Sequence, residues 1–85
     1  MQKENEVSLP TSAVLRPWMQ DALALVEVSA GSLARELGLS RNTLYNFLSA
    51  PDRTINLDTA QAVVARLRYK AILLQVSLPP LEADQ

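Results

Sequence analysis

Apolar residues recur at helical spacing near the start of the chain. Their intervals of three and four residues match one face of a helix. Pro17 fits in the first turn, where its missing N–H costs nothing, so we predict a helix over 17–28, with residues 12–16 adding a loose turn before it. The apolar face consists of Leu15, Trp18, Met19, Ala22, Leu23 and Val26.

Two shorter helices are predicted next. Ser29 or Ser32 can cap the first, and Gly38 can end it, because glycine adopts the left-handed conformation at low cost. Ser40 can cap the second, which a loop from Ala50 to Thr54 follows. The inward-facing residues of this pair are Leu33, Ala34, Leu37, Leu44, Phe47 and Leu48.

A fourth helix is predicted after Asn56, which can cap it. Its inward stripe is Leu57, Ala60, Val64 and Leu67. Arg66, Arg68 and Lys70 are expected near its end, where cations suit the negative pole of the helix dipole. The following run, Tyr69–Ser77, is short, contains β-branched and aromatic residues and precedes a Pro-Pro pair, so a short strand is one alternative and a continued or fifth helix is the other.

The pattern therefore predicts an all-α fold of four to five short helices with a short C-terminal strand as an optional addition. We divide the chain into a flexible N-terminal arm (1–11), a helical domain (12–69), a dimerisation element (70–77) and an acidic tail (78–85). No apolar run is long enough to span a membrane, and the polar first residues do not resemble a secretory signal. We expect a cytoplasmic protein.

Composition narrows the chemistry. The 85 residues include no cysteine and no histidine, which removes thiolate chemistry, the commonest general base and the commonest metal ligand. We expect that the chain is not an enzyme and that it binds neither a metal nor a cofactor. The net charge is −1, but residues 30–76 carry six basic against three acidic side chains, and the remainder carries two against six. Arg35 and Glu36, adjacent in the chain, are expected to form a solvated pair of little energetic value.

The segment from Ala30 to Ser49 has the features of a helix-turn-helix. This motif needs a small residue where the two helices cross and a residue that tolerates positive φ in the turn; Ala34 and Gly38 stand at those places. It also needs apolar inner faces, which are supplied by Leu33, Leu37, Leu39, Leu44 and Phe47. A solvated polar face on an ordinary helical domain is the alternative interpretation.

The outward side of the second motif helix carries groups that bind DNA. Arginine can bond two acceptors of guanine, asparagine can do the same for adenine, and a tyrosine ring can touch a thymine methyl. We expect base reading by Arg41, Asn42, Tyr45 and Asn46, with a phosphate contact as the alternative for Arg41. Contacts to the DNA backbone are expected from Ser29, Ser32, Ser40, Ser49 and Arg53.

The run Leu33–Ser40, together with the later Pro51-Asp52, resembles the lambda-repressor-like (XRE) family of bacterial repressors, in particular its HipB-type regulators. The resemblance covers about residues 17–76. It implies that Ala71–Val76 forms a strand that pairs with the same strand of a second subunit. The chain departs from the family at Ala30 and Gly31, where a glutamine usually begins the first motif helix, so the phosphate contact of that glutamine is not carried over.

The apolar run Ala71–Val76 has three interpretations: part of the core, a dimer strand, or a docking strip for another protein. We favour a homodimer, since one small domain covers only one side of the run. The expected interface residues are Ala71, Ile72, Leu73, Leu74 and Val76. We expect a repressor of plasmid or phage type that binds double-stranded DNA at an inverted-repeat operator as a homodimer, with a second regulator as a further partner. The alternatives are an antitoxin that binds a toxin and autoregulates its operon, and a protein-interaction module without DNA binding.

Overall fold

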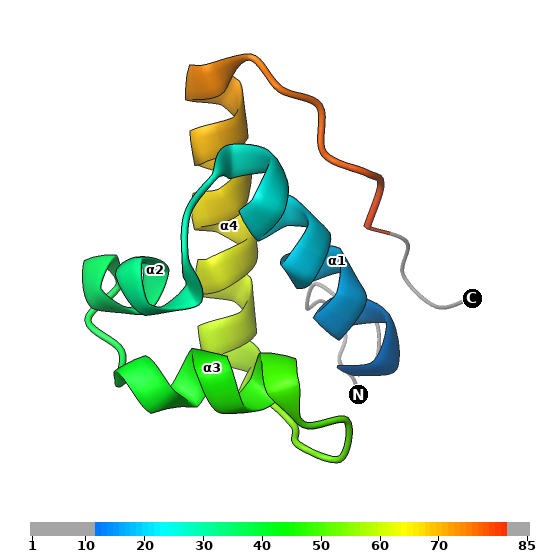
Figure 1. The fold of residues 1–85 in the computed structure, drawn as a ribbon, viewed down its shortest axis with the longest axis vertical. Coiled ribbons are helices and arrows are strands. Elements are labelled where there is room, and N and C mark those ends of the chain that lie inside the picture. The colour runs from blue at the N-terminus through cyan, green and yellow to red at the C-terminus, as the bar shows by residue number, and fades with distance from the viewer. Residues whose placement is uncertain (1–11, 82–85) are drawn as a thin grey trace, which may run out of the picture.

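Four helices build the part of the chain that the computed structural model describes, residues 12–81 (Figure 1). They are α1 (Ser12–Val26), α2 (Ala30–Glu36), α3 (Arg41–Ser49) and α4 (Leu57–Leu74). These residues contain no strand, so the predicted all-α class is confirmed. None of the four helices has the length and apolar character needed to cross a bilayer. The predicted arm, 1–11, and the last four residues of the predicted tail lie outside the described residues.

Helix α1 begins five residues earlier than the predicted helix. Pro17 is its sixth residue rather than a first-turn residue, and the missing N–H removes only the bond to the Ala13 carbonyl. Burial of Leu15 holds this early turn against the core. The helix ends at Val26 because Glu27 adopts a left-handed φ of 60°, and the Val28 N–H then donates to the Leu23 carbonyl (3.1 Å).

The turn between α2 and α3 follows the prediction closely. Ser29, not Ser32, caps α2 by accepting a hydrogen bond from the Ser32 N–H (3.1 Å). Gly38 has a φ of 73°, and the Leu39 N–H closes the turn onto the Ala34 carbonyl (2.8 Å). Ser40 caps α3 by accepting from the Asn42 N–H (3.3 Å).

Helix α4 is capped by Asn56, as predicted, and continues to Leu74. Ala71–Leu74 therefore belong to a continued helix and not to a strand, and the helix ends at Gln75, whose φ is 60°. The predicted inward stripe is wrong at Leu57, which lies at the exposed start of the helix. Because α4 is longer than predicted, Arg66, Arg68 and Lys70 do not lie in its last turn.

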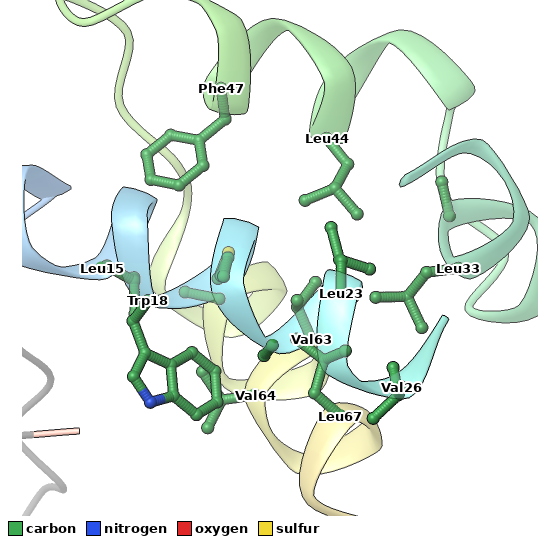
Figure 2. Close-up of a cluster of buried hydrophobic side chains, with 14 of the residues drawn as sticks. Leu15, Trp18, Leu23, Val26, Leu33, Leu44, Phe47, Val63, Val64 and Leu67 are labelled. Atoms are coloured by element: carbon green, nitrogen blue, oxygen red, sulfur yellow. The ribbon is translucent and has the colours of Figure 1, made fainter. Parts of the chain in front are cut away.

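The core forms where all four helices meet. Leu44 and Phe47 point from α3 toward α1, and Val63, Val64 and Leu67 approach from α4 (Figure 2). The predicted inner residues Leu37, Leu39 and Leu48 are only partly buried at its edge. The buried set is Leu15, Trp18, Met19, Ala22, Leu23, Val26, Leu33, Ala34, Leu44, Phe47, Ala60, Val63, Val64, Leu67 and Ala71.

The segment after α4 returns along α1 (Figure 1). The Trp18 indole N–H donates to the Pro79 carbonyl (2.8 Å). Val76, Leu78 and Leu81 pack against the core. The predicted acidic tail thus begins, between Leu78 and Leu81, as a packed part of the fold.

Candidate nucleic-acid interface

Helix α3 buries one side and leaves the other in solvent. Leu44 and Phe47 are almost completely buried, whereas Asn42 and Tyr45 are exposed and Asn46 is half-buried. This division follows from the helical rotation of about 100° per residue. The structure therefore places Asn42, Tyr45 and Asn46 together on one polar side, with Arg41 at the start of the helix.

The C-terminal end of α3 is held by side chains from α1. The Phe47 carbonyl would normally accept from residue 51, but Pro51 has no N–H. Arg16 replaces that donor: its Nε donates to the Phe47 carbonyl (2.6 Å). Gln20, one turn later, donates from Nε2 to the Leu48 carbonyl (2.8 Å). No local pattern in the sequence marks these contacts, because Arg16 and Phe47 are 31 residues apart.

Arg16 also fixes the loop after α3. A second guanidinium nitrogen donates to the Arg53 carbonyl (2.6 Å). The guanidinium carbon lies 4.6 Å from the centre of the Phe47 ring, within the range of a cation–π interaction. One side chain thus joins α1, the end of α3 and the loop that carries Arg53.

The five residues predicted to contact the DNA backbone differ in their free hydrogen-bonding groups. Ser29 and Ser40 accept bonds as helix caps, so each hydroxyl proton is left to donate to another acceptor. The Ser49 hydroxyl donates to the Tyr45 carbonyl (2.8 Å), so its proton is already used. Ser32 and Arg53 are exposed.

The surface of α2 and α3 carries cations without an opposing carboxylate. Between residues 28 and 51 the sole acidic residue is Glu36. It does not pair with its neighbour Arg35; its carboxylate turns to α4 and pairs with Arg66 Nη1 (2.9 Å) and Lys70 Nζ (2.8 Å). The hydrogen bond from Lys70, assisted by the one from Arg66, lowers the pKa of Glu36 against the opposing effect of desolvation.

The C-terminal end of α4 exposes apolar side chains, in contrast to the basic surface of α2 and α3. Ile72 is 73% exposed, Leu73 62%, Tyr69 55% and Leu74 54%; we call these four residues the apolar end of α4. Leu73 and Leu74 line a shallow groove with Val26 and Val28. Of the predicted dimer residues, Ala71 is buried in the chain's own core and Val76 is partly buried against it. Tyr69 begins the run predicted as a strand or a continued helix, but it is not among the predicted interface residues.

Comparisons of the chain with protein families, with characterised proteins and with solved structures found no match. Within residues 12–81, no three acidic side chains gather in a way that could hold a metal ion.

Proposed function

We propose that this chain is a sequence-specific DNA-binding repressor that acts as a homodimer on an inverted-repeat operator. Helices α2 and α3 form its helix-turn-helix, and α3 is the recognition helix. The observation that carries the proposal is the polar side of α3, where Asn42, Tyr45 and Asn46 lie together. A bound dimer represses by occupying DNA that the polymerase needs.

The way α3 is held supports this role. A recognition helix must keep its orientation when it enters the major groove, because misplaced side chains lose their base contacts. Here α3 is anchored by Leu44 and Phe47 in the core, by the Ser40 cap at its start and by Arg16 at its end. The polar side is thus the exposed face of a helix that is fixed at three places.

The chemistry of that side fits base edges. Asn42 and Asn46 carry amides that can bond adenine through two atoms. Tyr45, which is 60% exposed, can contact a thymine methyl or a phosphate. The resemblance to lambda-repressor-like proteins, carried by Leu33–Ser40, points to the same use of this segment.

The dimer uses the apolar end of α4. A strand pairing is not the route we favour, since Ala71–Leu74 are helical; two copies of α4 would instead pack their exposed Ile72 and Leu73 side chains together. Self-association covers apolar surface that one small domain leaves in water. A two-fold dimer also matches the symmetry of an inverted repeat. An antitoxin that autoregulates its operon would also bind DNA, so co-expression with the product of the neighbouring gene is the measurement that separates it from a simple repressor.

Selection from a pool of random duplexes tests the function. The purified chain is expected to enrich an inverted repeat whose half-sites are centred about 34–36 Å apart, or a multiple of that distance. Asn42→Ala should then lose discrimination at one base pair per half-site, worth about 1–3 kcal/mol. Failure to enrich any sequence, from a chain that remains folded, would reject sequence-specific binding.

A further inference from the structure

A small basic pocket lies where α2 meets the start of α3. It is lined by Gly31 and Arg35 from α2, by Leu39 from the turn and by Arg41, the first residue of α3. Resting on the proposed function, we propose that this pocket binds one phosphate group of the DNA backbone through Arg35 and Arg41 together. Arg41 is then a backbone contact rather than a reader of guanine.

Gly31 lines the pocket next to the side chain of Arg41. The side-chain stem of Arg41 passes over Gly31: a Cβ built on that glycine would lie 3.4 Å from Arg41 Cδ and 3.6 Å from Arg41 Cγ. These are ordinary van der Waals distances, so the stem lies directly against the position that a side chain at residue 31 would occupy. Arg41 therefore leans back onto α2, toward the face that carries Arg35.

The position of Arg41 around α3 agrees with a backbone contact. At about 100° per residue, Asn42 points within about 10° of the direction opposite to the core, whereas Arg41 lies about 90° from it. A helix of about 10–12 Å diameter fills a major groove about 12 Å wide. Residues at its centre then face base edges, and residues on its flank face the sugar–phosphate wall.

The charges around the pocket favour an anion. Within residues 12–81, neither Arg35 nor Arg41 has an ion-pair partner. The nearby Glu36 does not compete, since Arg66 and Lys70 bind its carboxylate. Guanidinium groups suit phosphate because their planar donors match its oxygens in pairs.

Binding titrations over a range of salt concentrations test the pocket without knowledge of the operator. A duplex of arbitrary sequence is used beside the selected one, with wild type, Arg35→Ala, Arg41→Ala and the double variant. Loss of one phosphate contact flattens the slope of log K against log salt by about 0.9, which corresponds to about eightfold weaker binding at 0.1 M salt. Arg35→Ala and Arg41→Ala should each flatten the slope by nearly this amount. The change should be the same on the arbitrary duplex as on the selected one.

The double variant is the sharper measurement. Two arginines that hold one phosphate are coupled, so the double variant should lose little more than a single one. Two independent contacts would flatten the slope by about two in total and would reject a shared pocket. Arg68→Ala is the matched control, because Arg68 is an exposed arginine of α4 outside the pocket; it should leave both slopes unchanged.

Other outcomes separate this inference from the proposed function. If Arg35→Ala has no effect, or if Arg41→Ala relaxes preference at one base pair, the pocket is rejected while DNA binding stands. If the wild type binds neither duplex in 50 mM salt, both are rejected. Inorganic phosphate, added at constant ionic strength, should not weaken DNA binding; a competition that Arg35→Ala abolishes would assign the pocket to free phosphate instead.

Discussion

The polar side of α3 and the apolar end of α4 are two exposed surfaces with different binding groups. They lie at opposite ends of the molecule (Figure 1). On α3 the exposed groups are amides and hydroxyls, which water solvates well. A ligand must replace that water with its own hydrogen bonds. On α4 the exposed side chains are Ile72, Leu73, Leu74 and Tyr69, which gain free energy from any apolar cover.

The difference assigns different kinds of partner to the two ends. Polar groups on a rigid helix favour recognition by hydrogen bonds, whose geometry discriminates between ligands. Apolar groups favour association that depends on buried area and on shape. A dimeric DNA-binding protein needs one surface of each kind, and it needs them apart, so that the dimer does not cover the DNA-binding helices.

The largest expected effect comes from a charge at the apolar end of α4. Ile72→Asp should produce a 9.3 kDa monomer instead of a dimer, because a carboxylate in an apolar interface would lose its hydration. Affinity for the operator should fall about 10²–10⁴-fold, since the second half-site contact is no longer intramolecular. Sedimentation and operator titration measure the two effects.

Leu57→Asp is the matched control for this substitution. Leu57 is an exposed leucine at the other end of the same helix, and an acidic residue in the first turn suits the helix dipole. It should leave the mass of the dimer unchanged. A wild-type chain that sediments as a monomer at tens of micromolar would contradict the proposed use of α4.

The next effect concerns the anchoring of α3. Arg16→Ala should lower the free energy of unfolding by about 2–3 kcal/mol, because the Phe47 carbonyl loses a charged donor that Pro51 cannot replace. Gln20→Ala removes a single neutral hydrogen bond and should cost about 1 kcal/mol. Urea unfolding measures both. Equal losses would show that the guanidinium has no special role at the end of α3.

The cost of replacing Gly38, in the turn before α3, should depend on backbone conformation alone. A Cβ at Gly38 would meet nothing within 4 Å, so any loss comes from its φ of 73°. Gly38→Val should cost about 1–3 kcal/mol, since β-branched residues resist positive φ. Gly38→Asn should cost less, because asparagine tolerates this conformation. Equal melting temperatures for the two variants would be inconsistent with this account of the turn.

Local sequence signals predict well the turn between α2 and α3 and the caps of α3 and α4. Ser40, Asn56 and Gly38 act through their own backbone neighbourhood, and the structure uses each of them as predicted. The same holds for Leu44 and Phe47, whose spacing defines the buried side of α3. Caps, turns and periodicity depend on residues only a few positions apart, so they can be recognised in a single sequence.

The C-terminal region was harder to predict because its structure depends on distant contacts. The run after Lys70 is apolar and partly β-branched, which suits a strand, but α4 continues through it to Leu74. Arg16, Glu36 and Pro79 find their partners 30 or more residues away along the chain. No local pattern marks such contacts, so the sequence predicts Arg35 as the partner of Glu36, whereas the structure pairs Glu36 with Arg66 and Lys70.

The smallest expected effect tests whether the polar side of α3 and the apolar end of α4 are energetically coupled. Glu36 joins the end of α2 to the C-terminal half of α4 through Arg66 and Lys70. The pKa of Glu36 is lowered in the folded chain, chiefly by the hydrogen bond from Lys70. The ionised carboxylate therefore stabilises the fold at pH values above its unfolded pKa, near 4.5. This stabilisation is lost as the pH falls through the lower, folded pKa. Wild type should therefore lose stability on acidification over that range, and Glu36→Gln should lack this part of the loss while remaining slightly less stable at pH 7. Thermal melts of both proteins between pH 3 and pH 7 measure the difference. The control is Asp21→Asn, a change at an exposed residue in the middle of α1 without an ion pair among residues 12–81. If the ion pairs also fix α2 against α4, Glu36→Gln should weaken operator binding at pH 7 without changing the mass of the dimer; unchanged binding would mean that α3 and the apolar end of α4 act independently.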